Sequence, residues 1–161
     1  LRKNLNGKWR NQLKKAESYD LIIEHDNKNS SFRWLMNEYD KLMIDKSFNG
    51  PSVDLYRTLY NNDRNALTIF KAIHEGKPVA GQMYIKHGNT STYLVGWNST
   101  SGRKMYLHNW LIWNAILLMK SENISYFDLG GVDKVNTPGI AKFKLGVKGR
   151  NFSLVGDWVS W

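Results

Sequence analysis

The sequence contains no cysteine. Disulfide bridges, zinc sites built from thiolates and a catalytic cysteine are therefore excluded. No apolar run reaches the roughly 18 residues that a membrane-spanning helix needs. The longest apolar-rich region, Trp110–Met119, is interrupted by Asn114. We therefore expect no membrane-spanning helix, while peripheral contact at a membrane surface stays open.

An initiator methionine and an apolar signal segment are also missing. The chain begins with Leu1-Arg2-Lys3, which gives it no apolar core of the kind that directs secretion. We therefore expect a piece of a longer protein, with the cytoplasm as its default compartment.

Negative charge is scarce relative to positive charge. The 161 residues include 23 Lys and Arg against 14 Asp and Glu, a net charge of +9. Such a balance favours polyanions such as RNA, nucleotides, phospholipid headgroups or phosphorylated precursors. Many basic proteins bind no nucleic acid, so the charge alone does not choose a partner.

Apolar periodicity predicts four helices. The first is basic and amphipathic, and its apolar stripe consists of Leu5, Trp9, Leu13 and Ala16. A second runs from about Ser31 to Asp45, with Ser30 or Ser31 as its N-cap, and a third from Val53 to Tyr60. The fourth, around Leu107–Met119, is apolar nearly all round, which predicts burial against a sheet.

Short β-rich runs predict the strands. They lie at residues 21–24, 66–75, 79–87, 91–98, 124–129 and 152–158. Polar turns of a few residues join the second, third and fourth, as in an antiparallel meander. No repeat or linker divides the chain, so we expect one α+β domain over residues 1–161, a mixed sheet flanked by helices.

The segment from Tyr126 to Arg150 concentrates the chemistry. Asp128 leads into Gly130 and Gly131, and Asp133 precedes a break at Pro138-Gly139. Three further cations surround Phe143-Lys144, namely Lys142, Lys148 and Arg150. Glycines let the backbone approach a ligand, and lysines attract an anionic one. We predict a binding or transfer site at the end of a strand.

Two segments of the chain resemble segments of a known family. The first segment is similar to a helix of the FemABX peptidoglycan aminoacyltransferases, a branch of the GNAT acyltransferase superfamily. Its sequence is Lys8-Trp9-Arg10-Asn11-Gln12-Leu13-Lys14-Lys15-Ala16. Tyr126–Gly131, followed by Gly139–Gly146, resembles the motifs that end the same domain. The resemblance covers nearly the whole chain, and the domain that the chain resembles is the second GNAT-like domain of that branch.

The resemblance implies a bacterial enzyme that moves an amino acid from aminoacyl-tRNA to an amine on the stem peptide of a peptidoglycan precursor. It implies no cofactor and no covalent intermediate, and it implies a companion GNAT-like domain, without which this chain is expected to be inactive. Both substrates are polyanions. A cytoplasmic location, with contact at the inner face of the membrane left open, fits this chemistry.

The resemblance also assigns roles to residues. Lys144 is expected to stabilise a phosphate or oxyanion, and the alternative is a surface lysine on a strand. Phe143 would stack on a base or sugar, or else half-bury in a strand. Asp128 would receive a proton, or hydrogen-bond the amides of the turn. Substrate contacts are further expected from Gly130, Gly131, Asp133, Lys142, Arg103, Lys104 and Arg10.

Two other features bear on the chemistry. Ser99–Lys104, expected as a loop, occupies the place where CoA-dependent GNAT enzymes hold a pyrophosphate, but its sequence departs from their Q/R-x-x-G-x-G/A pattern. Arg103 and Lys104 could still hold a phosphate there. Among the histidines, which share no metal-ligand spacing, His108 is a candidate base, with a packed or capping role as the alternative. No metal site is predicted.

Three functions therefore stay open. The first is a FemABX-type aminoacyltransferase, and the second is an acetyl-CoA-dependent N-acyltransferase acting on a sugar, peptide or small amine. The third is a non-catalytic domain that binds anionic polymers. The altered Ser99–Lys104 segment favours the first over the second, and the pairing of acids with Lys144 favours an enzyme.

Overall fold

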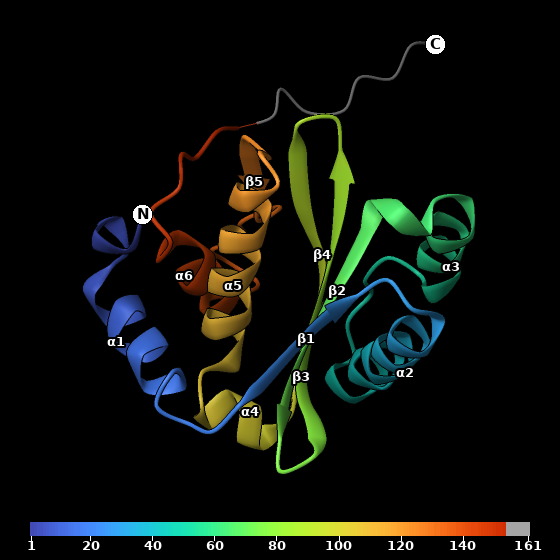
Figure 1. The fold of residues 1–161 in the computed structure, drawn as a ribbon, viewed down its shortest axis with the longest axis horizontal. Helices are drawn as coiled ribbons and strands as arrows, with labels where there is room; N and C mark the ends of the chain where they lie inside the picture. Colours follow the sequence, from blue (N-terminus) through green and yellow to red (C-terminus); the bar gives the residue numbers. More distant parts are fainter. Residues whose placement is uncertain (154–161) are drawn as a thin grey trace. The chain divides into compact units, whose positions relative to one another are not determined.

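The computed structural model describes residues 1–153 and orders helices and strands along the chain as shown in Figure 1. The elements are η1 (Arg2–Asn4), α1 (Gly7–Ala16), β1 (Ile22–Asp26), α2 (Asn29–Lys46), α3 (Val53–Asn62), η2 (Arg64–Ala66), β2 (Leu67–His74), β3 (Lys77–His87), β4 (Thr90–Asn98), α4 (Thr100–Lys104), α5 (Leu107–Ser121), β5 (Tyr126–Asp128) and α6 (Pro138–Leu145).

Internal contacts divide the chain into two units. The sheet unit is Asn11–Gly131, and the terminal unit combines Leu1–Arg10 with Val132–Trp161. One boundary falls inside helix α1 and the other directly after β5. Each unit is therefore built around its own contacts.

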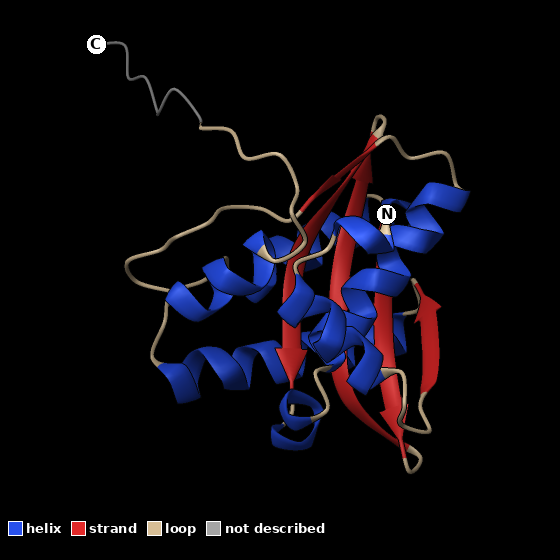
Figure 2. Ribbon diagram, turned by 90° about the vertical axis from the view of Figure 1, so that its left-hand side faces the viewer, coloured by secondary structure: helices blue, strands red, loops and turns tan. Residues whose placement is uncertain are grey.

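Five strands of the sheet unit form one sheet in the order β1-β2-β3-β4-β5. The pairs from β1 to β4 are antiparallel, and β5 joins β4 in parallel. The long strands of this meander are drawn in red in Figure 2. The expected mixed sheet with an antiparallel meander is confirmed, since short turns can join only antiparallel neighbours.

Helices cover both faces of this sheet, with α5 on one face and α2 and α3 on the other (Figure 1). Alternation along β3 serves the two cores, because Tyr84 packs with α5 while Met83 packs with α2 and α3. Phe70 and Leu35 are fully buried in these two cores. Each such side chain stabilises the fold by about 1.5–3 kcal/mol.

Trp9 organises the terminal unit. Its ring stacks on Phe143 with centroids 6.2 Å apart, and its indole Nε1 donates to the Phe143 carbonyl at 3.1 Å. The Asn6 amide donates to the carbonyl of Gly146 at 2.9 Å. The start of α1 is thus fixed to α6 by one aromatic pair and two hydrogen bonds.

Helix α2 begins earlier than the sequence predicted. Its N-cap is Lys28, so the expected N-caps Ser30 and Ser31 were wrong. The reason lies at the end of β1, where Asp26 accepts hydrogen bonds from the Lys28 amide at 3.0 Å and the Ser31 hydroxyl at 2.9 Å. The acid ends the strand and starts the helix, and the serine becomes a buried partner.

Three other predictions need correction or fall short. Residues 99–104 form the short helix α4 behind a Ser99 N-cap, and not a loop. Strand β5 covers only Tyr126–Asp128 of the predicted 124–129, because the Ile124 amide still closes the end of α5. The predicted last strand lies outside the described residues from position 154 onward, and its first two residues are not in a strand.

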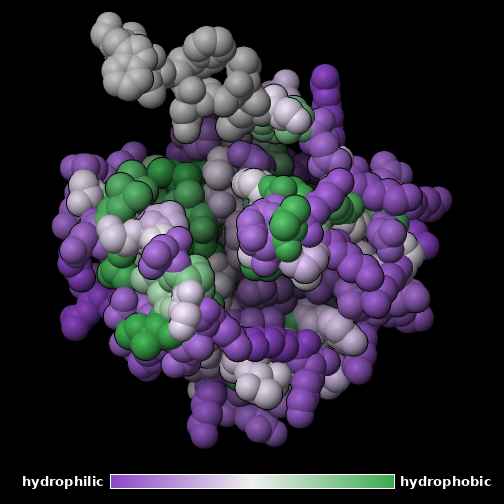
Figure 3. Space-filling view, turned by 180° about the vertical axis from the view of Figure 1, so that it is seen from behind, coloured by the Kyte–Doolittle hydropathy of each residue, from purple (hydrophilic) through white to green (hydrophobic). Residues whose placement is uncertain are grey.

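Hydrophilic residues, in purple, cover most of the face in Figure 3, where the hydrophobic areas in green are smaller. Exposed apolar side chains of the sheet unit include Ile44, Phe48 and Leu55 around the end of α2 and the start of α3. Apolar residues of this kind are normal on protein surfaces. The distribution of charge is therefore the more informative surface property.

Substitutions at Trp9 should separate its two contributions. Trp9→Phe keeps a ring against Phe143 but loses the indole hydrogen bond, so we expect a loss of about 1 kcal/mol in the free energy of unfolding. Trp9→Ala also leaves a cavity and should cost about 3–5 kcal/mol. Urea unfolding of both variants measures the difference, and equal losses would contradict the stacking contribution.

Candidate active site

Strand β5 leaves β4 early. It pairs with β4 only from Thr90 to Thr92, whereas β4 continues to Asn98. On the other side, the β3 register passes from Val95 to Tyr93 and skips Leu94. Such a bulge bends the strand and frees backbone groups, and bulges are frequent beside active sites. The second half of β4 is therefore the candidate place for a substrate.

His108, near the start of α5, takes up one of the backbone groups in this part of β4. Its Nε2 donates to the Trp97 carbonyl at 3.0 Å. Burial lowers the pKa of His108 to about 4, the bond to Trp97 opposes that shift, and the Arg103 charge adds to it. The ring is therefore neutral at pH 7, and its Nε2–H is engaged with the Trp97 carbonyl, as the packed and capping role requires. The role of a base stays a prediction.

A buried polar pair holds the same turn of α5 to β3. Gln82 is fully buried, and its Nε2 donates to the His108 carbonyl at 3.3 Å. Its Oε1 accepts from the Tyr84 hydroxyl. Burial raises the pKa of Tyr84 well above 10, so this hydroxyl stays a donor. Our sequence reasoning missed this network, although a glutamine within an apolar strand is a signal of it.

The β4–α4 turn is closed by its own side chains. Ser99 Oγ accepts from the Gly102 amide at 3.0 Å. Gly102 is buried, and a Cβ there would lie 2.5 Å from the Val79 carbonyl. Asn98 Oδ1, which lacks a hydrogen-bond partner among the described residues, lies against the same glycine. The amide that would meet a phosphate is already bonded.

Arg103 and Lys104 lie on α4 directly after this turn, and both are exposed. Their positions allow contact with a phosphate in solution, and the structure does not test the expected substrate contact.

At the end of β5, Asp128 shapes the glycine turn. Its Oδ1 accepts from the Gly130 amide at 2.8 Å. Gly130 has φ +71°, in the left-handed region that favours glycine. Gly131 has space around its Cα and needs no glycine for packing. Asp128 was expected either to receive a proton or to hydrogen-bond the amides of the turn. The structure contains the hydrogen bond to the turn.

Phe143 and Lys144 lie in helix α6, so their expected place on a strand was wrong. Pro138 at the first turn and the residues after it favour a helix. Phe143 is half-buried and engaged with Trp9. Lys144 is half-buried on the same helix, and Lys142 is exposed.

Asp133 organises the loop before α6. Its carboxylate accepts from the amides of Asn136 and Val135 and from the Asn136 side chain, each at 2.8 Å. These bonds, those from Asn136 first, lower the pKa of Asp133. The Asp133 carboxylate thus stabilises this turn, and the substrate contact expected of Asp133 stays a prediction.

Arg10, the remaining predicted contact, is exposed and donates from Nη1 to the Lys3 carbonyl at 3.2 Å. The predicted residues are thus divided between the units. Arg10, Asp133, Lys142, Phe143 and Lys144 belong to the terminal unit, and Asp128, Gly130, Gly131, Arg103 and Lys104 to the sheet unit.

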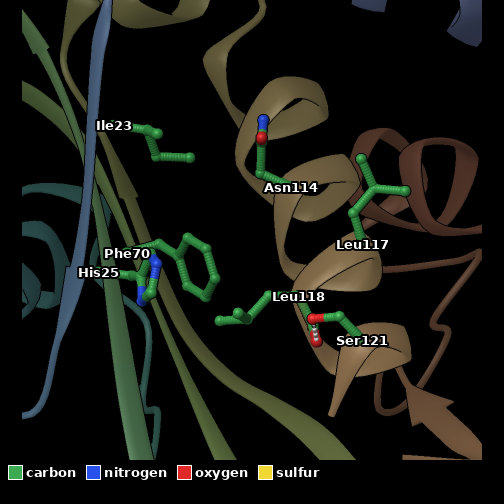
Figure 4. Close-up of a pocket in the computed structure, with 7 residues that line it drawn as sticks. All are labelled: Ile23, His25, Phe70, Asn114, Leu117, Leu118 and Ser121. Atoms are coloured by element: carbon green, nitrogen blue, oxygen red, sulfur yellow. Dashed lines mark hydrogen bonds between the residues drawn. The ribbon is translucent and has the colours of Figure 1, made fainter. Parts of the chain in front are cut away.

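A groove of about 320 Å³ lies beside the edge strand β1, between the sheet and α5 (Figure 4). Its lining consists of Ile23, His25, Phe70, Asn114, Leu117, Leu118 and Ser121. His25 packs on Phe70 with ring centroids 5.3 Å apart. The lining is mostly apolar and holds no acid.

Among the described residues, no cluster of three or more His, Asp or Glu side chains could hold a metal ion. Over the same part of the chain, none of the helices combines the length and apolar character needed to cross a bilayer.

The low pKa of His108 makes stability depend on pH. Unfolding returns the imidazole to a pKa near 6.5, so acid favours the unfolded chain. We expect the free energy of unfolding to fall from pH 6.5 to pH 4, with His108 contributing at most about 3 kcal/mol.

Urea unfolding at pH 7.5 and pH 4.5 measures this contribution. His108→Gln keeps an N–H donor for Trp97 but does not titrate, so its stability should fall less than that of the unaltered chain. His87→Gln, at an exposed site in β3, is the matched control and should keep the full fall. An unchanged pH dependence in His108→Gln would contradict the buried neutral imidazole.

Comparison with known proteins supplies the family. The sequence model of the acetyltransferase (GNAT) domain matches residues 2–145, and no curated protein matches the sequence significantly. The fold is similar to that of FemX, with a TM-score of 0.72 and 10% identity. That alignment covers 83% of this chain and 50% of FemX, so this chain spans half the length of that relative.

Two further structures are similar over nearly their full length. A possible acetyltransferase from Clostridium difficile 630 has a TM-score of 0.64 and 14% identity, over 88% of this chain and 99% of its own. An aminoglycoside acetyltransferase from an uncultured soil metagenomic sample has a TM-score of 0.59 and 17% identity, over 88% and 96%. At these identities the structures show a shared fold, and the matched residues show that this chain belongs to the GNAT acetyltransferase domain family.

Proposed function

We propose that this chain is the acyl-transfer domain of a FemABX-type aminoacyltransferase. It would take an amino acid from aminoacyl-tRNA and pass it to an amine on the stem peptide of a peptidoglycan precursor. The sequence motifs at Lys8–Ala16 and Tyr126–Gly146 support this branch of the family, and so does the similarity of fold to FemX.

The hydrogen bonding of the β4–α4 turn is the observation that favours an aminoacyl-tRNA donor over acetyl-CoA. CoA-dependent enzymes of this fold bind a pyrophosphate to free amides at the start of the helix after β4. Here the Gly102 amide donates to Ser99 Oγ, and the acceptor oxygen of Asn98 lies beside it. An acceptor oxygen repels a phosphate, so this turn suits a donor that does not need the pyrophosphate site.

The reaction itself asks little of the protein. The neutral amine of the acceptor attacks the ester carbonyl, a C–N bond forms, and the C–O bond to the terminal ribose breaks. The amine loses a proton, and the released ribose oxygen gains one. Proximity of the substrates and stabilisation of the tetrahedral oxyanion supply the rate. No nucleophilic side chain is required, which suits a sequence without cysteine.

We assign Lys144 to the charge of the donor phosphate or of the developing oxyanion. We assign Asp128 and Gly130 to the turn that ends β5, because the carboxylate is engaged with the Gly130 amide. Arg103 and Lys104, exposed on α4, are assigned to substrate phosphates. The precursor and a companion GNAT-like domain are the partners in this proposal, in the bacterial cytoplasm and with peripheral contact at the membrane.

A CoA-dependent N-acyltransferase is the second candidate. The observation that favours it is the similarity of fold to acetyltransferases, because this chain aligns with 96–99% of two of them. In that case acetyl-CoA would be the donor and a sugar, peptide or small amine the acceptor. The closed β4–α4 turn would then have to open when CoA binds.

Thermal unfolding with three ligands distinguishes these candidates. An acceptor-stem RNA carrying an amino acid through a stable amide, or a UDP-MurNAc-pentapeptide, should raise the melting temperature, while acetyl-CoA should not. A ligand at about 100 times its dissociation constant stabilises a protein by about 2.7 kcal/mol. Stabilisation by acetyl-CoA alone would overturn the proposal in favour of the second candidate.

Removal of the Lys144 charge should slow transfer while the fold survives. In the intact protein we expect Lys144→Ala to lower the transfer rate at least about tenfold, since a lost electrostatic contact in the transition state has effects of that order or larger. Lys144→Arg keeps the charge and should retain more activity. Unchanged turnover of Lys144→Ala in a tRNA-dependent assay would remove this residue from the mechanism.

A further inference from the structure

Positive charge is divided unequally between the two units. The terminal unit contains nine of the 23 Lys and Arg residues but two of the 14 Asp and Glu, so its 40 residues carry +7 of the net +9. The sheet unit has 14 basic against 12 acidic residues and is almost balanced. A charge excess confined to a quarter of the chain indicates a local function, because solubility alone would not concentrate it.

The helices of the terminal unit place four of these cations around one aromatic pair. Trp9 of α1 and Phe143 of α6 stack on each other. Successive residues of a helix point about 100° apart, so the neighbours of a contacting residue lie at the two rims of the contact. Lys8 and Arg10 flank Trp9 in this way, and Lys142 and Lys144 flank Phe143.

Lys3 joins this group through the backbone, because its carbonyl accepts from the Arg10 guanidinium at 3.2 Å. The side chains of Lys3, Lys8 and Lys142 are exposed. Within the described part of the chain, no carboxylate forms an ion pair with any of these three lysines. Asp133 is the acid closest in sequence to α6, and its carboxylate oxygens accept hydrogen bonds within its own loop.

We propose that the four exposed cations of this group, Lys3, Lys8, Arg10 and Lys142, form a cationic surface that binds the phosphodiester backbone of RNA. The inference rests on the proposed function in taking aminoacyl-tRNA as the physiological ligand. Phosphate contacts of this kind position a nucleic acid without reading its sequence. They would hold the acceptor stem of the aminoacyl-tRNA.

An anionic membrane is the other polyanion that such a surface could meet, and α1 argues against it. A helix that lies in a bilayer interface turns an apolar face to the lipid. Trp9 of α1 and Leu5 before it are buried in the protein instead. Around Trp9 the exposed residues of α1 are polar or charged, among them Lys8, Arg10 and Asn11, which suits the hydrated backbone of RNA.

The test compares two triple variants with equal loss of charge. The first carries Lys3→Gln, Lys8→Gln and Lys142→Gln, and it leaves Arg10 in place because its guanidinium bonds to the Lys3 carbonyl. The control carries Arg33→Gln, Lys77→Gln and Lys120→Gln, which are exposed positions of the sheet unit. Fluorescence anisotropy with an uncharged acceptor-stem RNA hairpin gives the dissociation constant at several salt concentrations.

We expect the first variant to bind the hairpin at least about tenfold more weakly at low salt. Its slope of log affinity against log salt should be smaller by about two to three, since each lost phosphate contact removes roughly one unit. The control should change little, and both variants should keep the melting temperature of the parent chain. A single Lys8→Gln variant, with a slope change of about one, gives the same test with less risk to folding.

Equal weakening in both triple variants would overturn the proposal, because net charge alone would then explain binding. Loss of binding to vesicles containing phosphatidylserine, with no measurable RNA binding by the parent chain, would also overturn it and assign the surface to lipid. Failure of the proposed function is separate. Transfer from acetyl-CoA would refute the aminoacyl donor, whereas the hairpin affinities refute or support the surface itself.

Discussion

The early separation of β5 from β4 is the constraint on which the sheet unit depends. Beyond Thr92 no β5 residue pairs with β4. The backbone N–H and C=O groups on that side of β4 therefore need other partners or a ligand. His108 supplies one such partner at the Trp97 carbonyl, and Gln82 ties the same turn of α5 to β3. The position of α5 and the chemistry available along β4 follow from these bonds.

Much of the fold could be predicted from local patterns. The meander follows from short turns between β-rich runs, and the burial of α5 from a helix that is apolar nearly all round. The Trp9 and Phe143 motifs, far apart in sequence, indicated the family before their contact was known. Strong periodicity and ordered motifs are local signals, and such signals are present in one sequence.

The errors came from contacts made at a distance along the chain or in competition with local preference. We expected Phe143 on a strand, whereas it lies in the helix that begins at Pro138. Asp26 began α2 early by accepting the Lys28 amide. The role of His108 depends on Trp97 and Gln82, which belong to other strands. In the structure Asp128 and Asp133 accept hydrogen bonds from turn amides, and their expected roles at a substrate stay predictions.

In the proposed function the donor is an aminoacyl ester. Mass spectrometry of a UDP-MurNAc-pentapeptide tests it directly, after incubation with the intact protein, mixed aminoacyl-tRNAs and acetyl-CoA together. We expect the precursor to gain the mass of one amino-acid residue, and to gain none when the aminoacyl-tRNAs are digested with ribonuclease before the incubation. A gain of one acetyl group, unaffected by that digestion, would refute the aminoacyl donor.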